Sequence, residues 1–127
     1  MTGFPSAVAT MVLVRDQGCC AYCGRHVSGL RGREWSIHHR KPRGMGGSGS
    51  PVVSSAANGV VLCGNGTMSC HGAVEKKREA AKLLGFLIPT NSIIDPVDVP
   101  IRHAIHGWVL LRNDGTFTQI DENKGEK

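Results

Sequence analysis

The chain has 127 residues, of which 15 are lysine or arginine and 10 are aspartate or glutamate, so its net charge is +5. A chain of this length forms one domain, or one domain with a small extension, and its few aromatic residues limit the hydrophobic core. Its apolar stretches fall short of the roughly 20 residues that a membrane span needs, and the basic charge is compatible with nucleic-acid binding without establishing it.

The first predicted element is a helix over residues 6–16, where apolar residues recur at helical spacing. No basic region precedes it, as a signal peptide would require. Cys20 and Cys23 then form a Cys-x-x-Cys turn, and Gly24 can supply the positive φ that the turn needs. Five cysteines could form disulfides in a secreted protein, but their odd number and this spacing favour metal ligation in the cytoplasm.

A strand is predicted next, over residues 34–39, because apolar and polar residues alternate there. It ends in His38 and His39, whose side chains should point to opposite sides of the strand. Residues 42–57 form a long glycine-rich segment without apolar periodicity, which predicts a loop. Three basic residues that directly follow the paired histidines are interpreted as phosphate contacts rather than solvated charges: Arg40, Lys41 and Arg43.

The next segment combines a short strand, predicted over residues 60–62, with a helix predicted over residues 71–84 and ended by Gly85. Four polar residues of ligand or site type flank these elements: Asn58, Cys63, Cys70 and His71. The order strand, loop, strand, helix therefore holds most of the candidate site residues.

The C-terminal part is rich in proline up to residue 100, and residues 107–120 are predicted to form a β-hairpin with its turn at Asp114-Gly115. His103 and His106 have no partners at metal-ligand spacing, and we interpret them as structural or surface residues. The predicted organisation is a lead-in over residues 1–17, a core over residues 18–87, and an extension over residues 88–127 that packs on the core.

Histidines and an asparagine in this order suit metal-dependent phosphodiester hydrolysis. That reaction needs an activated water, a cation on the phosphate and leaving oxygen, and an oriented base. His38 and His71 can bind a metal from two elements, while His39 faces the attacking water. Asn58 is neutral and cannot be the base, but its amide could bind the His39 ring or a backbone carbonyl and so fix the ring.

Four spaced motifs lie within about residues 20–85: His38-His39-Arg40-Lys41-Pro42, Gly46-Gly47, Asn58-Gly-Val-Val-Leu-Cys63 and Cys70-His71. Together they resemble the HNH endonuclease family, in which a hairpin and a helix grip one divalent cation in a ββα-metal fold. The resemblance implies an α+β protein with a small ββα-metal core, a structural zinc knuckle and a C-terminal β-hairpin extension.

Carried over by position, the resemblance implies that His39 is the general base and Asn58 the central asparagine of the family. It makes His38, a position that is often aspartate in the family, and His71 the ligands of a catalytic Mg²⁺, Mn²⁺, Ni²⁺ or Zn²⁺ ion. Glu75 lies where many members have a further ligand, although we interpret it first as a charge that favours the helix dipole.

Four cysteines resemble the structural zinc site of one branch of the family: Cys20, Cys23, Cys63 and Cys70. The second pair departs from the usual Cys-x-x-Cys, because six residues separate its members. Cys19 is left over, since using it instead of Cys20 would give a less common Cys-x-x-x-Cys turn.

The function implied is a metal-dependent endonuclease that hydrolyses DNA, with nicking of one strand as its elementary act. The C-terminal hairpin resembles that of small HNH proteins of phages and prophages, which are often linked to genome packaging beside the terminase. The main alternative is a non-catalytic, zinc-stabilised nucleic-acid-binding module. A structural zinc protein that bridges partners is a third interpretation, and it predicts no salt-sensitive affinity for DNA.

Overall fold

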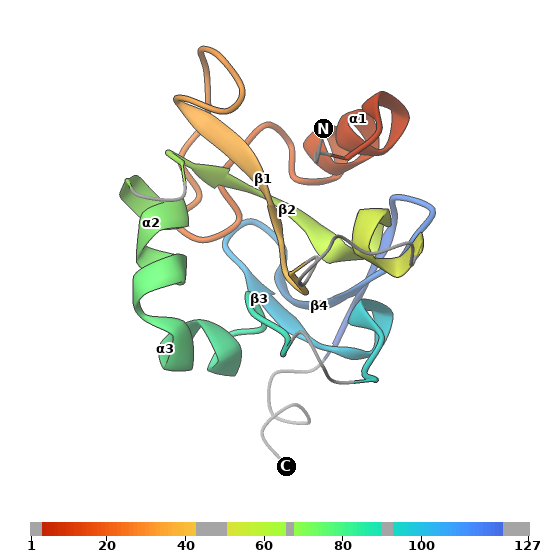
Figure 1. Ribbon diagram of the computed structural model, residues 1–127. Helices are drawn as coiled ribbons and strands as arrows, with labels where there is room; N and C mark the ends of the chain where they lie inside the picture. Colours follow the sequence, from red (N-terminus) through yellow and green to blue (C-terminus); the bar gives the residue numbers. More distant parts are fainter. Residues whose placement is uncertain (1–3, 43–50, 66–67, 90–92, 121–127) are drawn as a thin grey trace.

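The structure is a computed structural model that describes residues 4–42, 51–65, 68–89 and 93–120. Within these ranges the chain is a small α+β protein with two antiparallel sheets and three α-helices (Figure 1), which confirms the predicted class. Arg43 and Gly46-Gly47 lie outside the described residues. None of the described helices is long and apolar enough to cross a bilayer.

The first sheet is an antiparallel pair of β1 (Trp35–His39) and β2 (Gly59–Cys63), close to the two predicted strands. Its register pairs His39 with Gly59 at one end and Trp35 with Cys63 at the other. The paired histidines therefore lie beside the start of β2, whereas the first cysteine of the second pair lies at its far end.

The two faces of this sheet pack on different clusters, because side chains alternate along a strand. On one face, Ile37 and Val61 pack with Phe4 and with Val12 of α1 (Ser6–Arg15). The other face contributes to a larger cluster that includes Val60, Leu62, Phe86, Ile101, Val109 and Leu111. Figure 1 shows the result, with α1 in red on one side of β2 and the C-terminal strands in blue on the other.

The helix predicted over residues 71–84 is wrong as a single element, because the structure has α2 (Ser69–Lys76) and α3 (Arg78–Leu83). The break is at Lys77, whose φ of −106° and ψ of 63° lie outside the helical region. Beyond α3, Gly85 has a φ of 86°, and an added methyl group would meet the carbonyl of Pro100. This glycine turns the chain back toward the sheet, as expected of a residue that follows a helix.

The C-terminal sheet contains the predicted hairpin, β4 (Gly107–Leu111) and β5 (Phe117–Gln119), and an additional strand, β3 (Ile101–His103), which pairs with β4. The buried ring of His103 donates from Nε2 to Asp16 Oδ1 at 2.8 Å. His103 is therefore a structural residue that ties this sheet to the end of α1.

The prediction that Arg40 binds nucleic acid is wrong, because its side chain is completely buried. The guanidinium donates to four backbone carbonyls from three separate segments: Ala57 at 2.9 Å, Gly85 at 2.9 Å, Pro96 at 3.2 Å and Val99 at 2.7 Å. Burial and the charge of Arg15 lower the pKa of Arg40 to about 9. Arg40 thus fastens the end of β1 to the turn after α3 and to the C-terminal extension and does not reach a phosphate.

We expect Arg40→Ala to lower the free energy of unfolding by roughly 3–5 kcal/mol, because it leaves buried carbonyls without a donor and opens a cavity. Lys41→Ala is the matched control, and it should cost less than about 1 kcal/mol. Urea denaturation measures both. Equal stability of the two variants would contradict the structural role of Arg40.

Candidate metal centres

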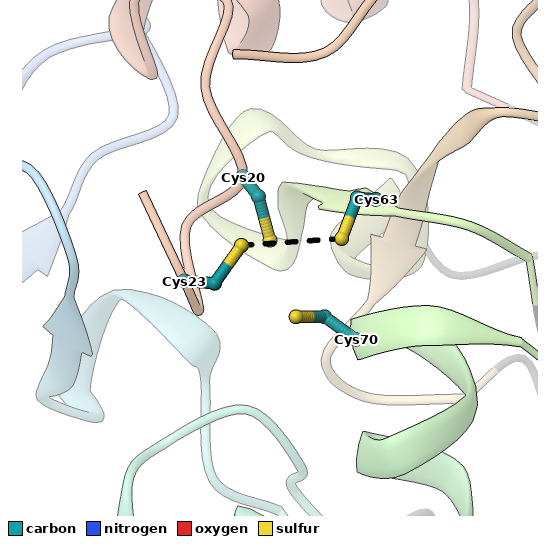
Figure 2. A group of neighbouring side chains, drawn as sticks. All are labelled: Cys20, Cys23, Cys63 and Cys70. Carbon is teal, nitrogen blue, oxygen red and sulfur yellow. Dashed lines mark hydrogen bonds between the residues drawn. The ribbon is translucent and has the colours of Figure 1, made fainter. Parts of the chain in front are cut away.

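The four predicted cysteine ligands come together at one point, as Figure 2 shows. Their Sγ atoms lie within 4.8 Å of one another, and the Sγ atoms of Cys23 and Cys63 are 4.0 Å apart. Tetrahedral zinc with Zn–S bonds of about 2.3 Å holds its sulfurs about 3.8 Å apart. The cluster could therefore bind zinc with little rearrangement. Cys19 is outside it and donates instead to the carbonyl of Gln17 at 3.4 Å.

The six-residue gap of the second pair is closed by a turn between a strand and a helix. Cys63 is the last residue of β2, and Cys70 lies in the first turn of α2. Gly64 has a φ of 83°, and a methyl group added to it would meet the carbonyl of Met68. Met68 in turn donates its N–H to the carbonyl of Asn65 at 3.0 Å. This turn brings the two sulfurs together despite the unusual spacing.

The surroundings of three of these thiols shift their pKa values in different directions. Burial raises the pKa of Cys20 and of Cys70. Burial acts in the same direction on Cys23, but hydrogen bonds from the backbone N–H of Arg25 and from neighbouring thiols outweigh it, so the pKa of Cys23 is lowered. Cys23 is thus more readily a thiolate than Cys20 or Cys70, and a bound metal would supply the positive charge that stabilises the thiolates of these two.

A second candidate metal centre joins the end of β1 to α2. His38 Nδ1 lies 3.3 Å from His71 Nε2, so the structure brings the predicted histidine pair together. Glu75 Oε2 lies 3.6 Å from the first nitrogen and 3.8 Å from the second. Glu75, which we interpreted first as a helix-dipole charge, is therefore also placed as a possible third ligand.

Hydrogen bonds on the outer side of the two rings assign their tautomers. His38 Nε2 donates to the carbonyl of Phe86 at 2.7 Å. The hydroxyl of Ser36 donates to the carbonyl of Gly64 at 3.1 Å, so it accepts a hydrogen bond from His71 Nδ1 at 2.6 Å. Each ring then carries its hydrogen on the nitrogen that faces away from the other ring. The two facing nitrogens present lone pairs that repel each other, and a cation between them would convert this repulsion into ligation.

Both rings are neutral, which is the form that binds a metal. Burial lowers the pKa of His38 to about 3. Burial also lowers the pKa of His71, although the charge of Glu75 opposes the shift. A metal would therefore not have to displace a proton from either ring at neutral pH.

These ligands line one wall of a pocket of about 480 Å³, and His39 lines it as well. The His39 ring stacks on Phe4, with ring centroids 4.2 Å apart and planes 16° apart. His38 and His39 lie on opposite faces of β1, as the alternation predicts, and both reach the pocket because the strand ends there. The proposed base and the metal centre therefore share one cavity.

Asn58 holds the backbone beside this pocket, which is the second of the two roles that its amide could take. Its Oδ1 accepts from the N–H of Lys41 at 2.7 Å, and its Nδ2 donates to the carbonyls of Lys41 and Val53, each at 3.0 Å. Because Lys41 is two residues beyond His39, these bonds fix the chain where β1 ends. The ammonium of Lys41 donates to the carbonyl of Ile94 at 3.2 Å, and its contact with phosphate stays a prediction.

Ser36 is a site residue that the sequence prediction missed. The signal was present, because Ser36 and His38 are two apart on a strand and so share a face. A hydroxyl has no distinctive spacing to its partner, however, and His71 is 35 residues away. Only the pairing of β1 with β2 and the position of α2 reveal the contact.

We expect Ser36→Ala to weaken divalent metal binding at the histidine centre by about 10- to 100-fold, because His71 loses the acceptor that fixes its tautomer. Calorimetric titration with Ni²⁺ of protein whose cysteine site is loaded with zinc measures this affinity. Ser36→Thr keeps the hydroxyl and serves as the control. An unchanged affinity in Ser36→Ala would show that the hydroxyl does not orient the ring.

No protein-family model, no curated protein and no solved structure matches the chain.

Proposed function

We propose that the chain is a metal-dependent endonuclease of the HNH type that hydrolyses DNA phosphodiester bonds, with β1, β2 and α2 as its ββα-metal core. The observation that carries the proposal is the convergence of His38, His71 and Glu75 in a pocket that His39 also lines. A ligand set of two imidazoles and one carboxylate leaves coordination positions for water and phosphate.

The bound cation would supply Lewis-acid stabilisation for the phosphate and for the leaving 3′-oxygen. His39 takes the proton of the attacking water, and its stacking on Phe4 holds the plane of the ring. Asn58 fixes the backbone that follows this base. The ligand set suits Zn²⁺, Ni²⁺ or Mn²⁺ as well as Mg²⁺, so the catalytic ion is left to experiment.

The proposed protein acts in the cytoplasm and takes part in phage genome packaging. All five cysteines are free thiols, which suits a protein of the reducing cytoplasm. The proposed role in phage genome packaging, beside a terminase, is supported by the resemblance of the C-terminal hairpin to that of small phage HNH proteins.

A supercoiled-plasmid assay tests the proposed function. Pure protein is incubated with Mg²⁺, Mn²⁺, Ni²⁺ or Zn²⁺, and conversion to the open circle is followed with and without a chelator. We expect nicking by the natural sequence with at least one ion and its loss in His71→Ala, which removes a metal ligand. Salt-sensitive DNA binding without nicking would instead support the zinc-stabilised binding module. Neither nicking nor DNA binding would favour a structural zinc protein.

A further inference from the structure

One cationic side chain lines the pocket of the histidine centre and has no role in the chemistry described so far. Arg78 is the first residue of α3, and it is the one arginine or lysine among the described residues that line this pocket. Its Nη1 donates to Glu75 Oε1 at 3.3 Å, and its side chain is half exposed. The carboxylate of Glu75 thus faces the two imidazoles with one oxygen and Arg78 with the other.

We infer that Arg78 binds a non-bridging oxygen of the DNA phosphodiester that occupies this pocket. This inference rests on the proposed function and adds a residue that holds the substrate. A phosphate that reaches a cation held by His38, His71 and Glu75 must enter the cavity that Arg78 lines. A guanidinium has five N–H donors in a planar fork that matches phosphate oxygens, and Glu75 engages only one nitrogen of it.

The energetics permit this exchange of partners. An ion pair that is open to water contributes little to stability, so a phosphate can replace Glu75 as the partner of Arg78 at little cost. The charge of Glu75 would then be balanced by the bound cation. Arg40 is buried and bonded to carbonyls, so it is not available to bind the phosphate.

The same chain offers another acid–base pair with the same sequence spacing, which lies within α3. Lys82 Nζ lies 3.2 Å from Glu79 Oε2, also three residues apart, and the lysine side chain is 41 % exposed against 50 % for Arg78. Lys82 does not line the pocket. If Arg78 were only a helix-stabilising charge, the two residues would respond alike to substitution.

The experiment compares Arg78→Gln with Lys82→Gln in a His39→Ala background, in which DNA is bound without being cut. Affinity for a short fluorescent duplex is measured at saturating Mn²⁺ over a series of salt concentrations. We expect Arg78→Gln to weaken binding about tenfold and to reduce the slope of log K against log salt by about 0.9, the value for one phosphate contact. Lys82→Gln should change neither quantity, and Arg78→Lys should keep the slope.

Two results would overturn the inference. One is the same affinity and salt slope in the two glutamine variants. The other is a weaker affinity of Arg78→Gln for Mn²⁺ that accounts for the whole loss, since Arg78 would then act only through Glu75. A natural sequence that fails to nick plasmid overturns the proposed function itself, and this is read in the separate plasmid assay.

Discussion

His39→Ala is expected to lower the rate of metal-dependent nicking by roughly 10²- to 10⁴-fold, the contribution typical of a positioned general base. The substitution removes the ring of the proposed base but leaves the three candidate metal ligands in place. It should therefore retain both metal centres and its affinity for DNA. Single-turnover nicking of supercoiled plasmid at saturating metal measures the rate. Metal titration and circular dichroism verify that the variant keeps its metal centres and its fold.

A second histidine provides the matched control, because His106 stacks on Phe117 as His39 stacks on Phe4. The ring centroids of the control pair are 4.0 Å apart, with planes 24° apart. His106 also binds the carbonyl of Arg15 at 2.8 Å, and it does not line the pocket of the metal centre. His106→Ala should lose some stability and keep its nicking rate at a permissive temperature. Equal activity losses in the two variants would remove the base from the mechanism.

Apart from Glu75, the members of both candidate centres could be predicted from sequence, because metal ligands are restricted to a few residue types. The Cys-x-x-Cys turn defines half of one site without reference to the rest of the chain. For His38 and His39, alternation along a strand was enough to predict that they lie on different faces. The turn that closes the gap between Cys63 and Cys70 depends on Gly64, whose position after the strand gave a partial signal.

Features that depend on distant segments could not be predicted. Arg40 and Lys41 look alike as neighbouring cations, and only the convergence of carbonyls from three later segments makes the first one structural. The break at Lys77 has no glycine or proline to mark it. Glu75 has the spacing of a charge one turn after His71, and its position beside His38 depends on how α2 packs against β2.

The two candidate centres are connected through adjacent parts of the backbone. Cys70 and His71 are consecutive in the first turn of α2, so a metal held by the first fixes the helix that presents the second. At the other end, Ser36 bonds both to His71 and to the carbonyl of Gly64, which directly follows Cys63. A metal in the cysteine site should therefore preorganise the histidine site, because the start of α2 carries one candidate ligand of each.

Removing the cysteine-bound metal is expected to unfold the protein, and Cys63→Ser tests this directly. Structural zinc contributes about 10–16 kcal/mol in small zinc domains, which equals or exceeds the 5–15 kcal/mol that usually separates folded from unfolded chains. The variant should lose one equivalent of zinc, measured by dye release, and its cooperative thermal transition. Cys19→Ser is the control, since Cys19 is a buried thiol outside the cluster, and it should keep both zinc and the transition. Full zinc content in Cys63→Ser, or loss of zinc in Cys19→Ser, would mean that the ligand set is different. The adjacency of Cys70 and His71 in α2 would then no longer explain how the histidine site is held.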